Sequence, residues 1–89
     1  MDPLGIYDFA ALPLSDRLAM VWEHGNFIAN VLDGGNGYAL YFLSGYFVEV
    51  EMTEQADTMH ITDAVPFRTG DRLNKYLAQV DLSEWVNAR

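Results

Sequence analysis

Cysteine is absent from this chain of 89 residues, and basic residues are few. Without cysteine the protein has no disulfide, no thiolate nucleophile and no cysteine-ligated metal site. Its two histidines are too few to form a zinc-type ligand cluster. Five Lys and Arg oppose 13 Asp and Glu, which gives a formal net charge of -8 and an isoelectric point of about 4.3. This charge disfavours direct binding to nucleic-acid phosphates and to anionic membrane surfaces.

Long apolar segments are also missing. The longest apolar run, residues 38–43, is far shorter than the roughly 20 residues that a membrane-spanning helix needs. The first residues lack the basic and apolar regions of a signal peptide, so we expect a cytoplasmic protein. With 51% hydrophobic and 13% aromatic residues, the 10.0 kDa chain suits one globular domain and is too apolar for an acidic disordered tail.

The N-terminal part of the chain predicts an arm followed by a helix. Residues 1–13 show no clean hydrophobic period, so we expect an irregular arm that packs Tyr7 and Phe9 onto the domain. Residues 14–25 carry apolar side chains at helical spacing and predict a helix. Ser15 is the expected N-cap of this helix, because its hydroxyl can accept a backbone hydrogen bond from the first turn.

The rest of the chain predicts a β-meander and a second helix. Residues 26–67 contain four β-type segments, divided by a Gly-rich turn at 33–37, a Ser-Gly turn at 44–45 and a polar loop at 53–57. Residues 68–89 predict a helix capped by its Thr and a short C-terminal turn. The predicted fold is therefore α+β: a four-stranded antiparallel β-meander packed against two helices, in two layers and one domain.

The turn at 44–45 fixes a strand register, and the register sorts the side chains by face. One face is apolar and is expected to be the core beneath the helices; it contains Phe27, Ala29, Val31, Ala39, Tyr41, Leu43, Tyr46, Val48, Val50 and Ile61. The opposite face is half apolar and half acidic; it contains Ile28, Leu32, Tyr38, Leu40, Phe42, Phe47, Glu49, Glu51, His60 and Thr62. Asp63 contradicts this register, since it would point into the core. Either the strand bulges there or Asp63 lies at the rim of the sheet.

The half-acidic face needs a cover that two short helices on the other face do not provide. The N-terminal arm or the segment around Trp85 is one such cover. A partner protein or a second copy of the chain is another, because a contiguous apolar patch rimmed by charge is typical of an interaction surface. The candidate partner surface comprises Ile28, Leu40, Phe42, Phe47, Glu49, Glu51 and His60.

Glu49, Glu51 and His60 form a constellation with acid–base potential. The two carboxylates share one face of a strand, about 7 Å apart at the backbone, and the predicted register places His60 across from Glu51. Such groups can exchange protons or bind a hard metal. Equally, two glutamates on an exposed strand discourage edge pairing, and a His opposite a Glu is an ordinary cross-strand pair. We therefore assign no catalytic, metal-binding or cofactor-binding residue.

Other catalytic motifs lack essential parts. The serines stand at expected caps or turns, and none lies in a G-x-S-x-G elbow. The Gly-rich turn lacks the Lys of a P-loop.

The distribution of charge is more informative, because residues 26–67 hold six acidic side chains and no Lys or Arg, whereas residues 68–89 carry a net charge of +1. The acidic meander could steer a basic partner toward the protein, or it could serve solubility alone.

The segment Tyr38–Val50, with the sequence YALYFLSGYFVEV, resembles a pattern in short bacterial proteins that have no known activity. In that family a helix ending in a Trp-containing turn precedes the meander, and a Leu-rich helix ends near Asp-Leu-Ser. The further matching pieces here are Leu18–Gly25, Tyr76-Leu77 and Asp81-Leu82-Ser83, so that the resemblance covers residues 14–83. An aromatic residue often follows V-E-V in the family, whereas this chain has Glu51. The resemblance implies a fold type and a bacterial origin but no activity.

Together these features predict a small acidic, non-enzymatic interaction module. Its expected partner is a protein with a basic surface, or a second copy of the chain, bound through the half-acidic face. Two alternatives stay open. One is an acidic decoy that inhibits a nucleic-acid-binding protein, and the other is a small-ligand protein or minimal enzyme that uses Glu49, Glu51 and His60.

Overall fold

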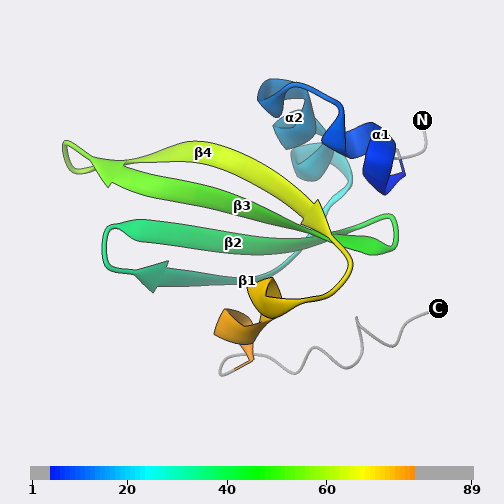
Figure 1. Cartoon of the computed structure of the whole chain (residues 1–89). Coiled ribbons are helices and arrows are strands. Elements are labelled where there is room, and N and C mark those ends of the chain that lie inside the picture. Colours follow the sequence, from blue (N-terminus) through cyan, green and yellow to red (C-terminus); the bar gives the residue numbers. More distant parts are fainter. Residues whose placement is uncertain (1–4, 78–89) are drawn as a thin grey trace.

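The computed structural model describes residues 5–77. Its elements are α1 (Ile6–Ala10), α2 (Leu14–His24), β1 (Asn26–Asp33), β2 (Asn36–Leu43), β3 (Tyr46–Gln55), β4 (Thr58–Phe67) and the 3-10 helix η1 (Asp71–Tyr76). The four strands form one antiparallel sheet in the order β1-β2-β3-β4, so each strand pairs with its neighbour in sequence (Figure 1). The predicted α+β fold with a four-stranded meander is confirmed.

Three two-residue turns join the strands. Ser44-Gly45 connects β2 to β3, as the sequence predicts, and both residues have positive φ values of 51° and 90°. Ala56-Asp57 connects β3 to β4, also with positive φ at both residues, 52° and 64°. Such turns match the right-handed twist of the strands they join. The Gly-rich turn and the polar loop are therefore shorter than predicted, because Asn36 and Gln55 belong to strands.

The predicted irregular arm contains a short helix, α1, with Gly5 as its N-cap. Phe9 of this helix is fully buried and contacts Tyr46 edge-to-face, with ring centroids 5.9 Å apart. Tyr7 is 86% exposed, since it lies on the opposite side of the same helix. The prediction that both aromatic side chains pack onto the domain was right for Phe9 and wrong for Tyr7.

The helix predicted over residues 14–25 is present as α2, but its N-cap is Pro13 and not Ser15. Two backbone N–H groups of the first turn donate hydrogen bonds of 3.0 Å to the carbonyl oxygen of Pro13. Proline suits this position, because its fixed φ, here -59°, leads directly into a helix and the N–H it lacks would have no helical partner. The helix ends before Gly25, as predicted.

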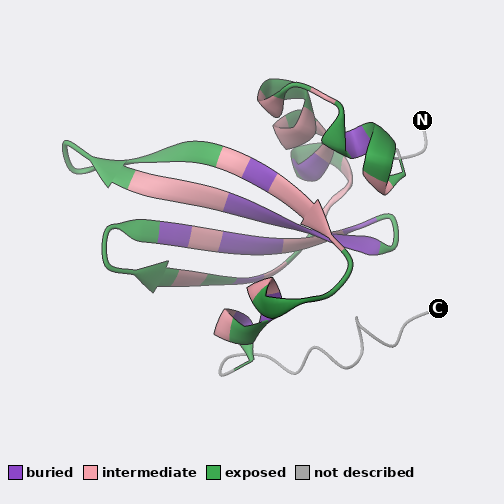
Figure 2. Cartoon of the chain, viewed as in Figure 1, coloured by how far each residue is buried: buried purple, intermediate pink, exposed green. Residues whose placement is uncertain are grey.

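The helices α1 and α2 cover one part of one side of the sheet, which we name the first face. The core there consists of Phe9, Val21, Ala39, Leu43, Tyr46, Val48, Val50 and Ala64. The 3-10 helix η1 lies against the opposite side, the second face, where the core consists of Ala29, Leu40, Phe47, Leu73 and Tyr76. Both sides of the sheet are therefore partly covered, whereas the sequence suggested both helices on one side. The far ends of β1 and β4 have exposed side chains (Figure 2).

A bulge in β1 changes which side chains of this strand face each core. Phe27 pairs with Tyr41, whereas Ala29 already pairs with the next residue of β2, so Ile28 is inserted in the ladder. An inserted residue shifts the alternation of the side chains by one position. Phe27 therefore stays on the first face, while Ala29 and Val31 pack into the second-face core. The prediction that all three share one face was wrong.

The pairing of the last two strands differs from the prediction, because the turn between them is shorter than expected and because β4 has a bulge at Thr62. Met52 pairs with Ile61, and the residue before Met52 pairs with Asp63, so that Thr62 is the extra residue. Ala64 takes the place in the first-face core that the sequence assigned to Ile61. Ile61 lies farther along the strand and is 38% exposed.

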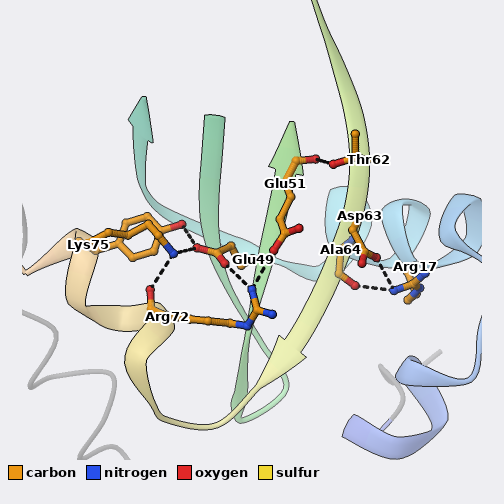
Figure 3. Close-up of polar contacts among 9 residues, drawn as sticks. Arg17, Glu49, Glu51, Thr62, Asp63, Ala64, Arg72 and Lys75 are labelled. Carbon is orange, nitrogen blue, oxygen red and sulfur yellow. Dashed lines mark hydrogen bonds and ion pairs between the residues drawn. The ribbon is translucent and has the colours of Figure 1, made fainter. Parts of the chain in front are cut away.

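The bulge also explains why Asp63 does not point into the core. Its carboxylate accepts a hydrogen bond of 3.1 Å from Nη1 of Arg17 in α2, and the same Nη1 donates to the carbonyl oxygen of Ala64 at 2.6 Å. The hydroxyl of Thr62 donates to a backbone carbonyl of β3 at 3.1 Å. Of the two predicted alternatives, the bulge is correct, and it brings an ion pair to the border between α2 and β4 (Figure 3).

The predicted C-terminal helix begins one residue later than expected and differs in type. Gly70, with φ of 126°, precedes η1, so Thr69 is not its N-cap. Leu73 and Tyr76 of η1 are buried against the second face. The remainder of the predicted helix and the C-terminal turn, residues 78–89, lie outside the described residues. None of the helices within residues 5–77 has the length and hydropathy required to span a bilayer.

Candidate functional site

A buried carboxylate stands at the centre of the second face. Glu49 lies in the middle of β3, and its side chain has no exposed surface. Its Oε1 atom accepts a hydrogen bond of 2.9 Å from Nη1 of Arg72. Its Oε2 atom accepts two hydrogen bonds of 2.7 Å, one from Nζ of Lys75 and one from the hydroxyl of Tyr76. All three donors come from η1 (Figure 3).

Glu51 joins this arrangement, because two residues along a strand its side chain points to the same face as Glu49. Its Oε2 atom accepts a hydrogen bond of 2.8 Å from Nη1 of Arg72, which therefore bridges both carboxylates. The ammonium group of Lys75 also donates to the backbone carbonyl of Arg72 and lies 4.6 Å from the ring centroid of Tyr38. We refer to Glu49, Glu51, Arg72, Lys75 and Tyr76 as the carboxylate cluster.

The geometry of a 3-10 helix explains how η1 supplies both charge and apolar contact. With three residues per turn, side chains three apart lie almost directly above one another. Arg72 and Lys75 therefore form one row, which meets the carboxylates. Leu73 and Tyr76 form the adjacent row, which packs into the second-face core. In an α-helix, two side chains three residues apart would instead differ in direction by about 60° around the helix axis.

The electrostatics of the cluster keep Arg72 and Tyr76 protonated. Burial raises the pKa of Tyr76 far above its usual range, and the hydrogen bond to the Glu49 carboxylate raises it further. For Arg72, burial acts to lower the pKa, but the hydrogen bonds to Glu49 and Glu51 outweigh it, so the pKa of Arg72 is raised. Two carboxylates thus face two cations and one neutral phenol, and the buried negative charge is compensated.

This arrangement leaves Glu49 no free position from which to act on a bound molecule. A general acid or base must reach the proton that it transfers, at about 2.6–3.2 Å or through one water. Both oxygens of Glu49 are occupied by donors of the chain itself, and the side chain is buried. The contacts of the cluster therefore fasten η1 to the sheet.

The predicted constellation of Glu49, Glu51 and His60 is only partly assembled. The two glutamates meet at Arg72, but His60 pairs with Thr53 and is exposed near the end of the β3–β4 hairpin. The turn between β3 and β4 causes this difference. Gln55 pairs with Thr58 across Ala56-Asp57, whereas the prediction left residues 53–57 as a loop, so His60 pairs two residues farther along β3 than expected. The prediction that His60 sits across from Glu51 was wrong.

The predicted partner surface is largely occupied by the protein itself. Leu40, Phe47 and Glu49 are buried, and Ile28 and Phe42 are half-buried and pack against the core beneath η1. With η1 in place, a second chain cannot contact the buried members of this surface. The expectation that the second face is open to a partner was therefore wrong for these residues.

The sequence contained a signal for the missing members of the cluster. No Lys or Arg occurs in residues 26–67, and the first basic residues after the strands include Arg72 and Lys75, three apart. Two glutamates on one strand face and two cations spaced for one helical row are complementary. The partners are 21 to 26 residues apart in the chain, so their pairing depends on the tertiary fold.

A different surface is open on the first face, where α1 and α2 do not cover the sheet. Large apolar side chains, each more than a third exposed, gather along β1, at the far end of β4 and at the C-terminal end of α2. We refer to Trp22, Phe27, Leu32, Met59 and Ile61 as the open patch. Half-buried Tyr41 and Met52 lie between them on β2 and β3.

The two ends of the open patch differ in character. At one end, Trp22 and Phe27 each contact Tyr41 edge-to-face, with ring centroids 5.6 Å apart in both pairs. At the other end, aliphatic side chains converge over Gly37, where a Cβ atom would lie 2.8 Å from Cε of Met59 and 3.4 Å from Cδ2 of Leu32. The glycine therefore lets these side chains lie directly on the backbone of β2.

The open patch lies within an acidic surface. Glu54 pairs with Met59 in the ladder, and Asp33 and Asp57 are exposed at the same end of the sheet. The four strands hold no Lys or Arg. Within residues 5–77, His, Asp and Glu side chains form no group of three or more that could hold a metal ion. The chemistry offered at this surface is apolar contact surrounded by negative charge.

No known protein family, curated protein or solved structure matches the chain. The resemblance to short bacterial proteins therefore stays a prediction. The structure defines a small α+β domain in which the carboxylate cluster joins η1 to the second face and the open patch faces solvent.

Proposed function

We propose that the protein is a small acidic, non-enzymatic interaction module that binds a protein with a basic surface through the open patch. One observation carries the proposal: five large apolar side chains are exposed on one face of the sheet and at a helix end, acidic residues border one end of this surface, and the strands have no basic residue. Contiguous exposed apolar side chains rimmed by charge are typical of interaction surfaces. The negative field attracts a basic partner and raises its association rate.

A basic partner fits this surface better than a second copy of the chain. Two copies would each bring a net charge of -8, and contact through the open patch would place Glu54 and Asp57 of both chains near one another. Like charges brought together at an interface cost affinity. A partner with Lys or Arg would instead compensate the acidic rim and cover the apolar centre.

The carboxylate cluster supports a role in binding over the two alternatives. A decoy that imitates nucleic acid presents its carboxylates to a partner, but Glu49 and Glu51 are tied to Arg72. A minimal enzyme built on these glutamates would need a proton-transfer partner, and His60 lies elsewhere. Among the acidic residues that remain exposed, Asp33, Glu54 and Asp57 border the open patch.

Selection from a display library of random twelve-residue peptides tests the proposal with the full chain as bait. We expect enriched peptides to combine Lys or Arg with large apolar residues, and their affinity to fall as salt concentration rises. The double variant Leu32→Gln, Ile61→Gln should lose this binding, while the control Leu77→Gln, at an apolar residue that is 56% exposed outside the open patch, should keep it. Enrichment of peptides without basic residues, or binding unaffected by the double variant, would refute the proposal.

A further inference from the structure

The aromatic end of the open patch presents fixed ring surfaces to solvent. Trp22 is 54% exposed and Phe27 is 56% exposed, although each contacts the half-buried ring of Tyr41. The interplanar angles of 66° and 70° are those of edge-to-face pairs, which fix the orientation of the rings. Ring surfaces that are already oriented lose little conformational entropy when a partner binds.

The protein itself shows which chemistry suits aromatic rings beside carboxylates. On the second face, Nζ of Lys75 lies 4.6 Å from the ring centroid of Tyr38 and 2.7 Å from Oε2 of Glu49. The ammonium group thus interacts with the negative face of a ring and with a carboxylate at the same time. Within residues 5–77, the two cation–π contacts both belong to Lys75.

On the first face, Trp22 has one acidic neighbour in sequence, and the Arg of α2 is engaged elsewhere. Arg17 is the one Arg or Lys of α2, and its guanidinium binds Asp63 and the carbonyl of Ala64 at the β4 side. Glu23 follows Trp22 in sequence; its side chain is 73% exposed, and its Oε1 lies 3.9 Å from Nε2 of His24. This exposed carboxylate and the net charge of -8 attract a cation that another molecule brings to the rings.

We infer that Trp22, Tyr41 and Phe27 receive an arginine side chain of the partner. This inference rests on the proposed function and names the partner's chemistry. Arginine suits the rings better than lysine, because its planar guanidinium stacks on aromatic faces and is more weakly hydrated. Phe27 and Leu32 stand five residues apart on β1, about 15 Å along a strand. A partner segment that bridges both therefore carries arginine and, about four to six residues away, a large apolar side chain.

Three synthetic peptides test the inference: acetyl-X-Ser-Gln-Thr-Gln-Leu-amide, where X is Arg, Lys or citrulline. Citrulline retains the planar shape of arginine and lacks its charge. Titration of the isotope-labelled full chain, followed through the amide signals of Phe27 and Tyr41, gives the affinities. We expect the Arg peptide to bind most tightly, the Lys peptide more weakly, and the citrulline peptide about fivefold more weakly than the Arg peptide, or worse.

Matched variants show whether the rings are responsible. Trp22→Leu retains an apolar side chain and should weaken the Arg peptide about fivefold while leaving the citrulline peptide unchanged. Tyr7→Leu removes an aromatic ring that is 86% exposed outside the open patch, and it should have no effect. Phe27→Leu repeats the test at the other exposed ring.

The outcomes separate this inference from the proposed function. Equal affinities for the Arg and citrulline peptides, or an Arg affinity unchanged in both Trp22→Leu and Phe27→Leu, would overturn the inference. The display selection would still support the proposed function if basic, apolar peptides bind through Leu32 and Ile61. A selection without such peptides would overturn the proposed function, whatever the three synthetic peptides do.

Discussion

Replacing Glu49 by Gln tests whether the carboxylate cluster fastens η1 to the sheet. The change preserves the shape of the side chain but removes its charge and one of its two acceptor oxygens. Arg72, Lys75 and Tyr76 would then offer three donors to a single carbonyl oxygen, with the new amide group adding a further donor. Breaking a buried ion pair by removing one partner costs about 3–5 kcal/mol. Because the Arg72 side chain is 42% exposed and retains Glu51, we expect the lower end, about 3 kcal/mol.

The free energy of unfolding, measured by urea denaturation at pH 7, gives this cost directly. Glu51→Gln is the matched control, since it makes the same chemical change on the same strand face. Its side chain is 28% exposed and has one ion pair, with Arg72, so its loss should cost less than about 1 kcal/mol. Trypsin adds a local readout, because η1 contains two trypsin sites, Arg72 and Lys75, and Glu49→Gln should speed cleavage there.

Two results would refute this reasoning. Equal losses of stability in Glu49→Gln and Glu51→Gln would mean that burial of the first carboxylate has no special importance. A loss below about 1 kcal/mol in Glu49→Gln, with unchanged trypsin cleavage in η1, would mean that apolar contacts hold this helix without the cluster.

Three further predictions follow from the same structure. Because the pKa of Tyr76 is raised in the folded protein, the unfolded chain loses the phenol proton first, and the free energy of unfolding falls as pH rises past about 10. Tyr76→Phe should make this fall shallower by up to about 1.4 kcal/mol per pH unit in urea denaturation. An unchanged slope would contradict the prediction. In α1, Phe9→Ala should cost about 3 kcal/mol and Tyr7→Ala less than about 0.5 kcal/mol in urea denaturation, and similar costs would mean that α1 does not belong to the core. A Cβ atom at Gly45 or at Gly35 would meet no atom within 4 Å, but of these two residues only Gly45 has positive φ. Gly45→Ala should therefore lower the thermal midpoint of unfolding by the equivalent of about 1–2 kcal/mol, while Gly35→Ala leaves the midpoint unchanged.

The hairpin between β2 and β3 shows what local sequence can establish. Ser44-Gly45 is a strong turn signal, and the pairing that it predicted, with Leu43 opposite Tyr46, is the pairing observed. The bulge at Ile28 had no such signal, and the bulge at Thr62 was indicated only by Asp63, whose predicted place was in the core. A bulge adds a single residue to a strand that otherwise alternates normally, and it is stabilised by packing against elements distant in sequence.

The carboxylate cluster shows the same limit for a site. The spacing of Glu49 and Glu51 correctly predicted that they share a face. Their exposure was predicted wrongly, because a Glu-x-Glu pair in a strand carries no local mark of burial. The donors come from η1, more than 20 residues later, and their position depends on how the chain turns at Gly70. The charge pattern indicated that complementary partners existed, whereas the fold decided which of them met.

The bulge in β1 changes which core the later side chains of this strand enter. β1 contributes Phe27 to the first face and Ala29 to the second, although alternation alone would give both to one face. Ile28 and Thr62 are thus positions at which the length of the chain matters more than the identity of the side chain. A homologous sequence that lacks one of these residues would keep its fold only if the polar and apolar positions beyond the deletion, as far as the end of that strand, were exchanged.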